Sequence, residues 1–216
     1  MADIQRGFEL LSTGEIDELR CLLDRDPAVA EARDAAGVSL LMQSLYRGRR
    51  ELAESIAAKK TELDIFEAAS LGRLERLRKC AHDAAQLNSR SSDGFTALHF
   101  ACFFHQPEAA RLLIEMGAAV DVVAANPMRV MPLHSAVSAR NLEAARLLLE
   151  HGAPVNARQQ GGWVPIHAAA QNDDRAMVEL LLQNGADPQL ANDEGKTPPA
   201  VAREKGHAEV AALLEK

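Results

Sequence analysis

A four-residue phrase recurs along this chain at a nearly constant spacing. Its copies are Thr96–His99, Met131–His134, Val164–His167 and Thr197–Ala200. The last residues of successive copies are 35, 33 and 33 positions apart. A fixed period in this range is typical of a stack of small repeated units, in which each unit contacts mainly its two neighbours. The sequence therefore predicts an elongated array of repeats rather than a globule built around one core.

Each copy of the phrase is followed by the same order of residue types. A short apolar run, a polar break and a second, leucine-rich run lead to a glycine, as in Ala110–Met116 before Gly117. Threonine is a good N-cap, proline suits the first helical turn, and a glycine in the left-handed conformation commonly ends a helix. The repeated unit is therefore predicted to be a helix, a tight turn, a second helix and a non-helical excursion.

The phrase, the paired short helices and the closing pattern at 152–156, Gly-Ala-Pro-Val-Asn, resemble ankyrin repeats. The resemblance implies an all-α solenoid, an alpha horseshoe whose helix pairs are linked by short β-hairpin fingers. When the repeats are aligned on the residue that separates the two helices of each pair, the pattern extends upstream to Gly72, Gly48 and Gly14. One ankyrin domain of seven repeats then covers residues 1–216, in the segments 1–33, 34–60, 61–90, 91–125, 126–158, 159–191 and 192–216, the first and last being caps.

Two irregularities interrupt the repeat spacing. Met42 and Phe66 occupy equivalent positions only 24 residues apart, which predicts that the second repeat has lost its finger and that a notch separates repeats two and three. The finger at 120–130 is two residues longer than usual and has Arg129 where glycine is expected at the turn. Methionine and valine also replace threonine at the N-cap of two copies, for an expected loss of about 1 kcal/mol each.

Composition and charge disfavour several classes of partner. The net charge of −7 and the pI near 5.5 argue against binding nucleic acid or an anionic membrane surface. Neither a signal peptide nor a membrane-spanning run of 18 apolar residues is recognisable. Three widely spaced cysteines, Cys21, Cys80 and Cys102, lie in helical patterns and are interpreted as reduced core thiols of a cytoplasmic protein.

Three histidines, His99, His134 and His167, stand at equivalent positions and raise the question of a metal site. Zinc needs ligand nitrogens within about 2.0–2.1 Å, whereas packed helices lie roughly 8–10 Å apart, so the three cannot share one ion. The resemblance implies instead that each histidine forms hydrogen bonds locally and with the adjoining repeat. No nucleophile with a base, phosphate-binding loop or zinc-spaced cysteine pair is recognisable, so we expect no metal, no cofactor and no enzymatic activity.

The resemblance also implies where a partner would bind: at the finger tips and at the two residues that close each first helix, along the concave face. The only tyrosine, the only tryptophan and three of the six phenylalanines fall on these positions. Large rigid aromatic side chains often carry most of the affinity of an interface. The predicted partner-binding residues are Tyr46, Arg47, Leu71, Phe95, Phe103, Phe104, Met128, Arg129, Val130 and Trp163. Phe95 and Trp163 could equally pack along the finger row.

The sequence thus predicts a non-catalytic protein–protein interaction module that presents a rigid concave groove to a partner protein. Whether binding inhibits, scaffolds or stabilises that partner stays open. A monomer is expected, with self-association through the groove as one alternative. Another alternative, of a different class, is a small-molecule or enzymatic site in the notch, around Tyr46, Arg47, Glu67 and Leu71.

Overall fold

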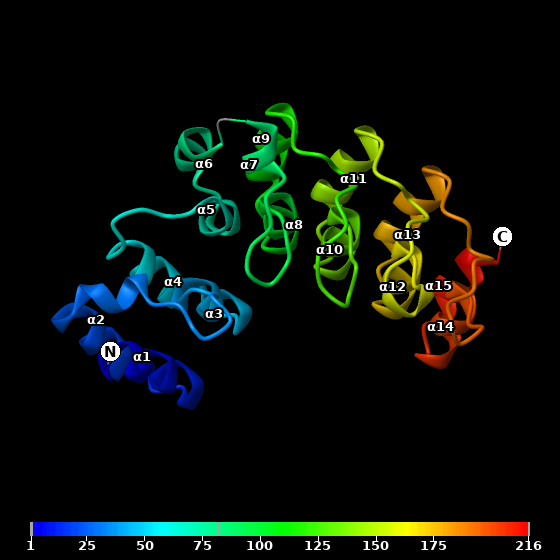
Figure 1. Ribbon diagram of the computed structural model, residues 1–216. Coiled ribbons are helices and arrows are strands. Elements are labelled where there is room, and N and C mark those ends of the chain that lie inside the picture. The colour runs from blue at the N-terminus through cyan, green and yellow to red at the C-terminus, as the bar shows by residue number, and fades with distance from the viewer. Residues whose placement is uncertain (1, 82, 216) are drawn as a thin grey trace.

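The helices of the chain form a curved row with the two termini at opposite ends (Figure 1). The structure, a computed structural model, describes residues 2–81 and 83–215. Met1, His82 and Lys216, which belong to the first, third and last predicted segments, lie outside the described residues. Within the described part the chain is helical and has no strand, so the predicted helical solenoid is confirmed.

Fourteen of the helices form seven consecutive pairs in the described residues. The pairs are α1 (Ala2–Thr13) with α2 (Ile16–Arg25), α3 (Leu40–Tyr46) with α4 (Arg50–Ala57), α5 (Ile65–Leu71) with α6 (Leu74–Cys80), α8 (Ala97–Phe103) with α9 (Pro107–Glu115), α10 (Pro132–Ser138) with α11 (Leu142–Glu150), α12 (Pro165–Gln171) with α13 (Arg175–Gln183), and α14 (Pro198–Glu204) with α15 (Ala208–Leu214). Shorter elements are η1 (Pro27–Glu31), α7 (Ala84–Leu87) and η2 (Gln160–Gly162). Each predicted segment contains one pair.

A residue in the left-handed conformation reverses the chain inside every pair. All seven have φ between 55° and 82°: they are Gly14, Gly48, Gly72, His105, Arg140, Asp173 and Gly206. The turn is only about three residues long, and the left-handed conformation closes it by ending the first helix. The sequence spacing of 24 between Gly48 and Gly72 is therefore a real shortening between two intact pairs.

First and second helices form an inner and an outer row (Figure 1). The third residue of the repeated phrase lies in the core, since Leu98, Leu133 and Ile166 are at most 1% exposed. The first helices also bury alanines such as Ala101 and Ala136, whose small side chains allow neighbouring helices to approach closely. The periodic apolar residues thus form one continuous core along the array.

The fingers between the pairs differ from the predicted β-hairpins. Among the described residues the only bridge of β type joins Arg33 and Ser39. Each finger is a turn, and neighbouring fingers share single backbone hydrogen bonds: Ala125 N–H to Gly94 O at 2.9 Å, Gln160 N–H to Met128 O at 3.0 Å, and Asp193 N–H to Gly161 O at 2.9 Å. The two-stranded part of the prediction was wrong, because within a finger the chain is closed by isolated backbone bonds, such as Ala124 N–H to Val130 O at 2.8 Å, and forms no ladder.

A short link, residues 58–64, joins α4 to α5 and carries no finger. Its Lys60 is buried, and Lys60 Nζ lies 2.8 Å from Glu31 Oε2 and 3.4 Å from Glu67 Oε1. Glu67 is completely buried at the start of α5, where its carboxylate also accepts the Asp64 N–H. An ion-pair network therefore fastens the link to η1 and α5, because a buried carboxylate must be paired.

The fingers on either side of this link meet each other directly. Gly37, with φ +82°, faces Ser92 so closely that an added Cβ would lie 3.1 Å from Ser92 Cβ. The Tyr46 hydroxyl, at the end of α3, donates a hydrogen bond to the Asp93 carboxylate. A cavity of about 180 Å³ remains behind these contacts, so the predicted notch is largely bridged on the inner side.

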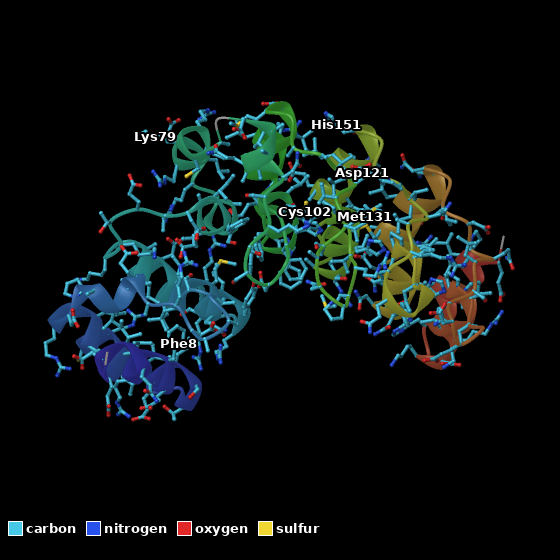
Figure 2. All side chains as sticks on the ribbon, viewed as in Figure 1. Phe8, Lys79, Cys102, Asp121, Met131 and His151 are labelled. Atoms are coloured by element: carbon cyan, nitrogen blue, oxygen red, sulfur yellow. The ribbon has the colours of Figure 1, made fainter. Side chains whose placement is uncertain are left out.

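The cysteines correct another expectation. Cys102 is fully buried on α8, inside the stack (Figure 2). Burial raises the pKa of its thiol well above the ordinary value. Cys80 is half-buried, but Cys21 is exposed, so the core location was wrong for Cys21. Cys21 lies on the outward face of α2, while Leu19, Leu22 and Leu23 face the core.

Candidate functional site

The three phrase histidines connect each first helix to the next finger. The Nδ1 atoms of His99, His134 and His167 accept the backbone N–H of the residue before the helix, at 3.3, 3.1 and 3.2 Å. Since Nδ1 accepts, Nε2 carries the proton. It donates to the carbonyls of Val130, Ala157 and Lys196, respectively, at 3.0–3.1 Å. The local and inter-repeat bonds implied by the resemblance are present.

This arrangement changes the role expected for the residue before the helix. The Thr96 side chain does not cap the backbone of α8; its hydroxyl lies 2.8 Å from His99 Nδ1 instead. Met131 and Val164 keep the backbone bond to their histidine. The expected loss of a helix cap at these two positions was therefore wrong, and what they lack is one hydroxyl–imidazole bond.

Burial makes these histidines weak bases. Desolvation lowers the pKa of His99 and of His134 to about 4, although their bonds to carbonyls oppose it, and also lowers that of His167. All three are therefore neutral near pH 7. The described residues contain no group of three or more His, Cys, Asp or Glu side chains placed to hold a metal ion.

Aromatic rings cluster where the finger-less joint meets α8. Phe100, which is 3% exposed, lies at the centre, with its ring centroid 6.0 Å from Phe66, 5.6 Å from Phe95 and 6.3 Å from Phe104. The Tyr46 ring stacks on Phe104 at 6.0 Å. This packing holds the end of α3 against α8 although their sequences are about fifty residues apart.

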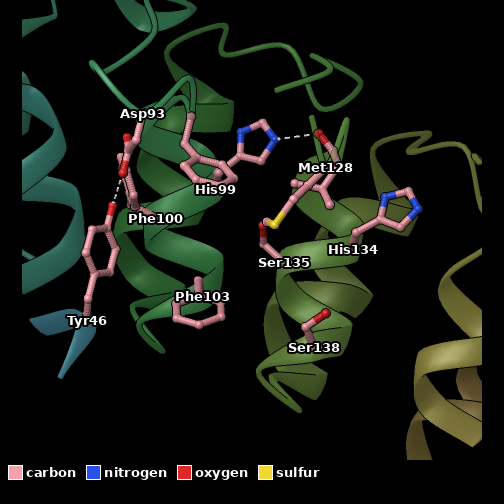
Figure 3. Close-up of a pocket in the computed structure, with 11 residues that line it drawn as sticks. Tyr46, Asp93, His99, Phe100, Phe103, Met128, His134, Ser135 and Ser138 are labelled. Carbon is pink, nitrogen blue, oxygen red and sulfur yellow. Dashed lines mark hydrogen bonds between the residues drawn. The ribbon is translucent and has the colours of Figure 1, made fainter. Parts of the chain in front are cut away.

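A pocket of about 370 Å³ opens between the ends of α8 and α10 and their fingers (Figure 3). Its lining residues are Tyr46, Asp93, Phe95, His99, Phe100, Phe103, Met128, Val130, His134, Ser135 and Ser138. Four large hydrophobic side chains are exposed in the described residues, and three of them, Tyr46 (40%), Phe103 (44%) and Met128 (48%), line this pocket. The fourth is Ile4, in the first helix.

The enlarged finger holds Met128 over the pocket. Arg129 adopts φ +52° at the turn, in the place where glycine was expected. Asn126 Oδ1 accepts the Met128 N–H at 3.1 Å, and Asn126 Nδ2 donates to Asp93 O at 2.9 Å. The finger is thus fixed both internally and to its neighbour, which places the Met128 side chain without help from a β-hairpin.

The predicted binding residues divide into those at this pocket and those away from it. Tyr46, Phe95, Phe103, Met128 and Val130 line it. Arg47 and Arg129 are exposed but do not line it, and Phe104 is half-buried behind the Tyr46 ring. Trp163 lines a neighbouring depression of about 360 Å³ beside polar residues of α12, and Ser138 borders both cavities.

Two of the predicted residues are largely buried, and only one of them, Val130, reaches the pocket. Leu71 is 3% exposed and Val130 is 7% exposed. Leu71 and Phe104 each directly precede a left-handed turn residue and pack against the core, whereas Arg47 at the equivalent position is exposed. Val130 forms the pocket floor, where its carbonyl accepts the His99 bond. Of the four residues named for the notch site, Glu67 and Leu71 are buried, and Tyr46 and Arg47 are exposed.

Phe100 and Ser135 were missed by the sequence analysis. Phe100 follows the phrase in a core position, and only its helical spacing to Phe103 and Phe104 could have suggested a cluster. Ser135 carries no signal except that Ser138, three residues later, lies on the same helix face.

Comparison with known families identifies the class of protein that this fold and surface define. Two family models match the chain: "Ankyrin repeats (3 copies)" over residues 65–159 and "Ankyrin repeats (many copies)" over residues 148–202. The chain belongs to the ankyrin repeat family. Ankyrin repeats generally mediate protein–protein interaction and are generally not enzymes.

Several proteins are similar in sequence. The putative ankyrin repeat protein YahD of Escherichia coli is 28% identical over 74% of this chain and 98% of its own length. The human B-cell lymphoma 3 protein is 40% identical over 60% of this chain but only 28% of its own length. A putative E3 ubiquitin-protein ligase of Arabidopsis thaliana, XBAT35, is 29% identical over 70% of this chain and 26% of its own length. No helix in the described residues has the length and apolar character to cross a membrane.

Proposed function

We propose that this chain is a non-catalytic binding module whose partner is a protein that contacts the pocket between α8 and α10. The observation that carries the proposal is the gathering of Tyr46, Phe103 and Met128, three of the four exposed large hydrophobic side chains of the described residues, around one pocket. Interface energy is concentrated in a few large side chains near a concave centre. Scattered surface hydrophobics need no such explanation, but a cluster does.

The pocket is held in shape by bonds that exist before any partner binds. The Tyr46 hydroxyl is fixed by Asp93, and the neighbouring fingers share backbone hydrogen bonds. A preordered surface loses little conformational entropy on binding, so more of the contact energy contributes to affinity. This supports rigid display as the mode of binding.

The polar groups of the pocket support a non-catalytic role. His99 and His134 are neutral and use both ring nitrogens in backbone hydrogen bonds. Asp93 accepts the hydroxyls of Tyr46 and Ser91. None of these groups is left to act as a general acid or base. The free cysteines support a cytoplasmic location as part of the proposal.

A peptide-display selection with the chain as bait tests the proposed function. The affinity of a selected peptide is measured for the wild-type chain and for the double variant Phe103→Ser/Met128→Ser, with circular dichroism as a check of folding. Loss of two hot-spot side chains should weaken binding at least about thirtyfold. Phe104 is left intact, because its ring supports the aromatic cluster.

Ile4→Ser is the matched control, since Ile4 is equally exposed at 39% but far from the pocket. It should leave the affinity unchanged. Selected peptides that bind the double variant as tightly as the wild-type chain would refute the proposal. Self-association through the same surface is the alternative function, and it predicts concentration-dependent light scattering that Phe103→Ser abolishes.

A further inference from the structure

One wall of the pocket carries two hydroxyls that the protein does not use. Ser135 and Ser138 lie three residues apart on α10 and therefore on one face of that helix (Figure 3). Neither hydroxyl is hydrogen-bonded to another described residue, whereas the Tyr46, Asp93, His99 and His134 side chains in the same lining all are. Ser135 is 8% exposed as a residue, and Ser138 is exposed.

Other buried serines of the inner row show what is unusual about Ser135. Ser44 donates to Leu40 O at 2.8 Å, and Ser70 donates to Phe66 O at 2.8 Å, in each case one helical turn back. This bond is the usual way in which a helical serine satisfies its hydroxyl. Ser135 makes no such bond, and it lines the pocket. Its hydroxyl is therefore available to a ligand.

The other walls suit a flat ring. Phe103 projects from α8 across from the serines of α10, and Met128 lies above them on its finger (Figure 3). An aromatic ring can pack edge-to-face on phenylalanine and can contact a methionine sulfur favourably. At about 370 Å³ the pocket is near the small end of the range for ligand sites, which suits a single large side chain.

Charge restricts the ligand further. Asp93 is the only lining residue that is charged near pH 7, because His99 and His134 are neutral there. No cationic side chain lines the pocket. A carboxylate or phosphate placed here would lose its hydration beside a like charge, which is costly. An uncharged ligand fits this lining.

We infer that the pocket binds an uncharged aromatic side chain that can form a hydrogen bond, namely the phenol of a tyrosine. A protein partner supplies this side chain. The ring lies between Phe103 and Met128, and its hydroxyl meets Ser135 and Ser138. The inference rests on the proposed function and specifies the chemistry of the anchor residue in the partner.

Methyl NMR of Met128 tests this directly. The chain is labelled at its methionine methyl groups, the Met128 signal is assigned with Met128→Leu, and four amides are titrated: N-acetyl-tyrosinamide, N-acetyl-phenylalaninamide, N-acetyl-leucinamide and N-acetyl-phosphotyrosinamide. The tyrosine amide should give a saturable shift and bind about three- to tenfold tighter than the phenylalanine amide. The leucine amide should bind more weakly than either, and the phosphotyrosine amide should give no shift.

The variant Ser135→Ala/Ser138→Ala should remove the preference for tyrosine while leaving the affinity for the phenylalanine amide unchanged. Alanine is a strong helix former, so α10 should persist. Ile4→Ser, on the first helix and outside the pocket lining, should alter none of the four titrations.

Three results would overturn the inference: equal affinities for tyrosine and phenylalanine amides, a leucine or phosphotyrosine amide that binds as tightly as the tyrosine amide, or no Met128 shift with any amide. Each would leave the proposed function standing if displayed peptides still bind in a Phe103-dependent manner. If no displayed peptide binds in this manner, the proposed function itself is refuted.

Discussion

At the scale of single residues, the phrase histidines explain why the repeats keep one register. Each imidazole accepts a bond at the start of its own helix and donates one to the following finger, so a single side chain fixes two elements. The bonds require the neutral ring with its proton on Nε2. A neutral, buried imidazole makes the stability of the fold dependent on pH.

We predict that acidification destabilises the protein through His99 and His134. Their pKa in the folded chain is about 4, against 6.5 for the ordinary value. As pH falls below 6.5 the unfolded chain takes up protons first, so the stabilisation is complete above pH 6.5 and is lost toward pH 4. Each histidine should lower the free energy of unfolding by about 1.4 kcal/mol per pH unit in that window. Urea unfolding between pH 7.5 and 4.5 measures this.

The variant His134→Gln provides the control for this slope. It should be less stable at pH 7.5 but should lose stability less steeply on acidification, because one titrating group is gone. Identical slopes for variant and wild type would contradict the assignment.

The repeat register predicted part of the pocket lining. Phe103 and Met128 could be placed at the concave face because the repeat register fixes which residue closes a helix and which forms a finger tip. Leu71 was misplaced, since the register does not reveal that this one side chain packs inward while Arg47 at the equivalent position is exposed. The hydrogen bond from Tyr46 to Asp93 joins residues 47 positions apart, and no local pattern contains it.

At the scale of elements, the turns inside the helix pairs solve one geometrical problem with different residues. Gly14 supplies the left-handed conformation in the first pair, and His105 supplies it in the fourth. Glycine adopts this conformation at little cost, whereas a residue with a Cβ is strained in it. The sequence could place these turns because their spacing follows the repeat. It could not predict that the fingers lack strands, since the ankyrin pattern itself implied hairpins.

The turn residues give a paired prediction. His105→Gly should stabilise the chain by up to about 1 kcal/mol, because the His105 side chain is exposed and its φ is +56°. Gly14→Ala should destabilise it by about 1 kcal/mol, since φ is +82° there. No neighbouring atom lies within 4 Å of the added Cβ at Gly14, so the cost comes from the backbone alone. Urea unfolding measures both; effects of the same sign would refute the explanation.

At the scale of the whole molecule, the array is continuous but unevenly coupled. Close packing joins α5 to α8, α8 to α10, and α10 to α12. By contrast, α3 and α5 make far fewer contacts with each other. Contacts across the joint include the Lys60 ion pairs, the contact of Gly37 with Ser92 and the ion pair of Arg33 with Asp64 at 2.8 Å. The Tyr46 side chain adds its bond to Asp93 and its stacking on Phe104. In a linear array, coupling between neighbours determines which repeats unfold together. The joint should therefore divide the chain into two cooperative units.

Native-state hydrogen exchange should show that residues 2–57 open together, at a lower free energy than α8–α13. Tyr46→Phe should lower the opening free energy of residues 2–57 by about 1 kcal/mol without affecting α10–α13. Met177→Ala, which removes a fully buried side chain of α13, should do the reverse and destabilise the C-terminal unit by about 2–5 kcal/mol. One uniform opening free energy across all helices would exclude two units.

The same division has a consequence for binding. Tyr46 belongs to the N-terminal unit, yet it lines a pocket whose other walls belong to α8, α10 and their fingers. The pocket is complete only while both units are closed, so a ligand that contacts Tyr46 binds the closed form preferentially and stabilises it. A displayed peptide that binds the pocket should therefore slow hydrogen exchange in α3 and α4. If exchange slows only in α8 and α10, Tyr46 is not part of the binding surface. Tyr46→Ala, measured with the same peptide, separates these outcomes, because it should abolish the protection of α3 while α10 stays protected.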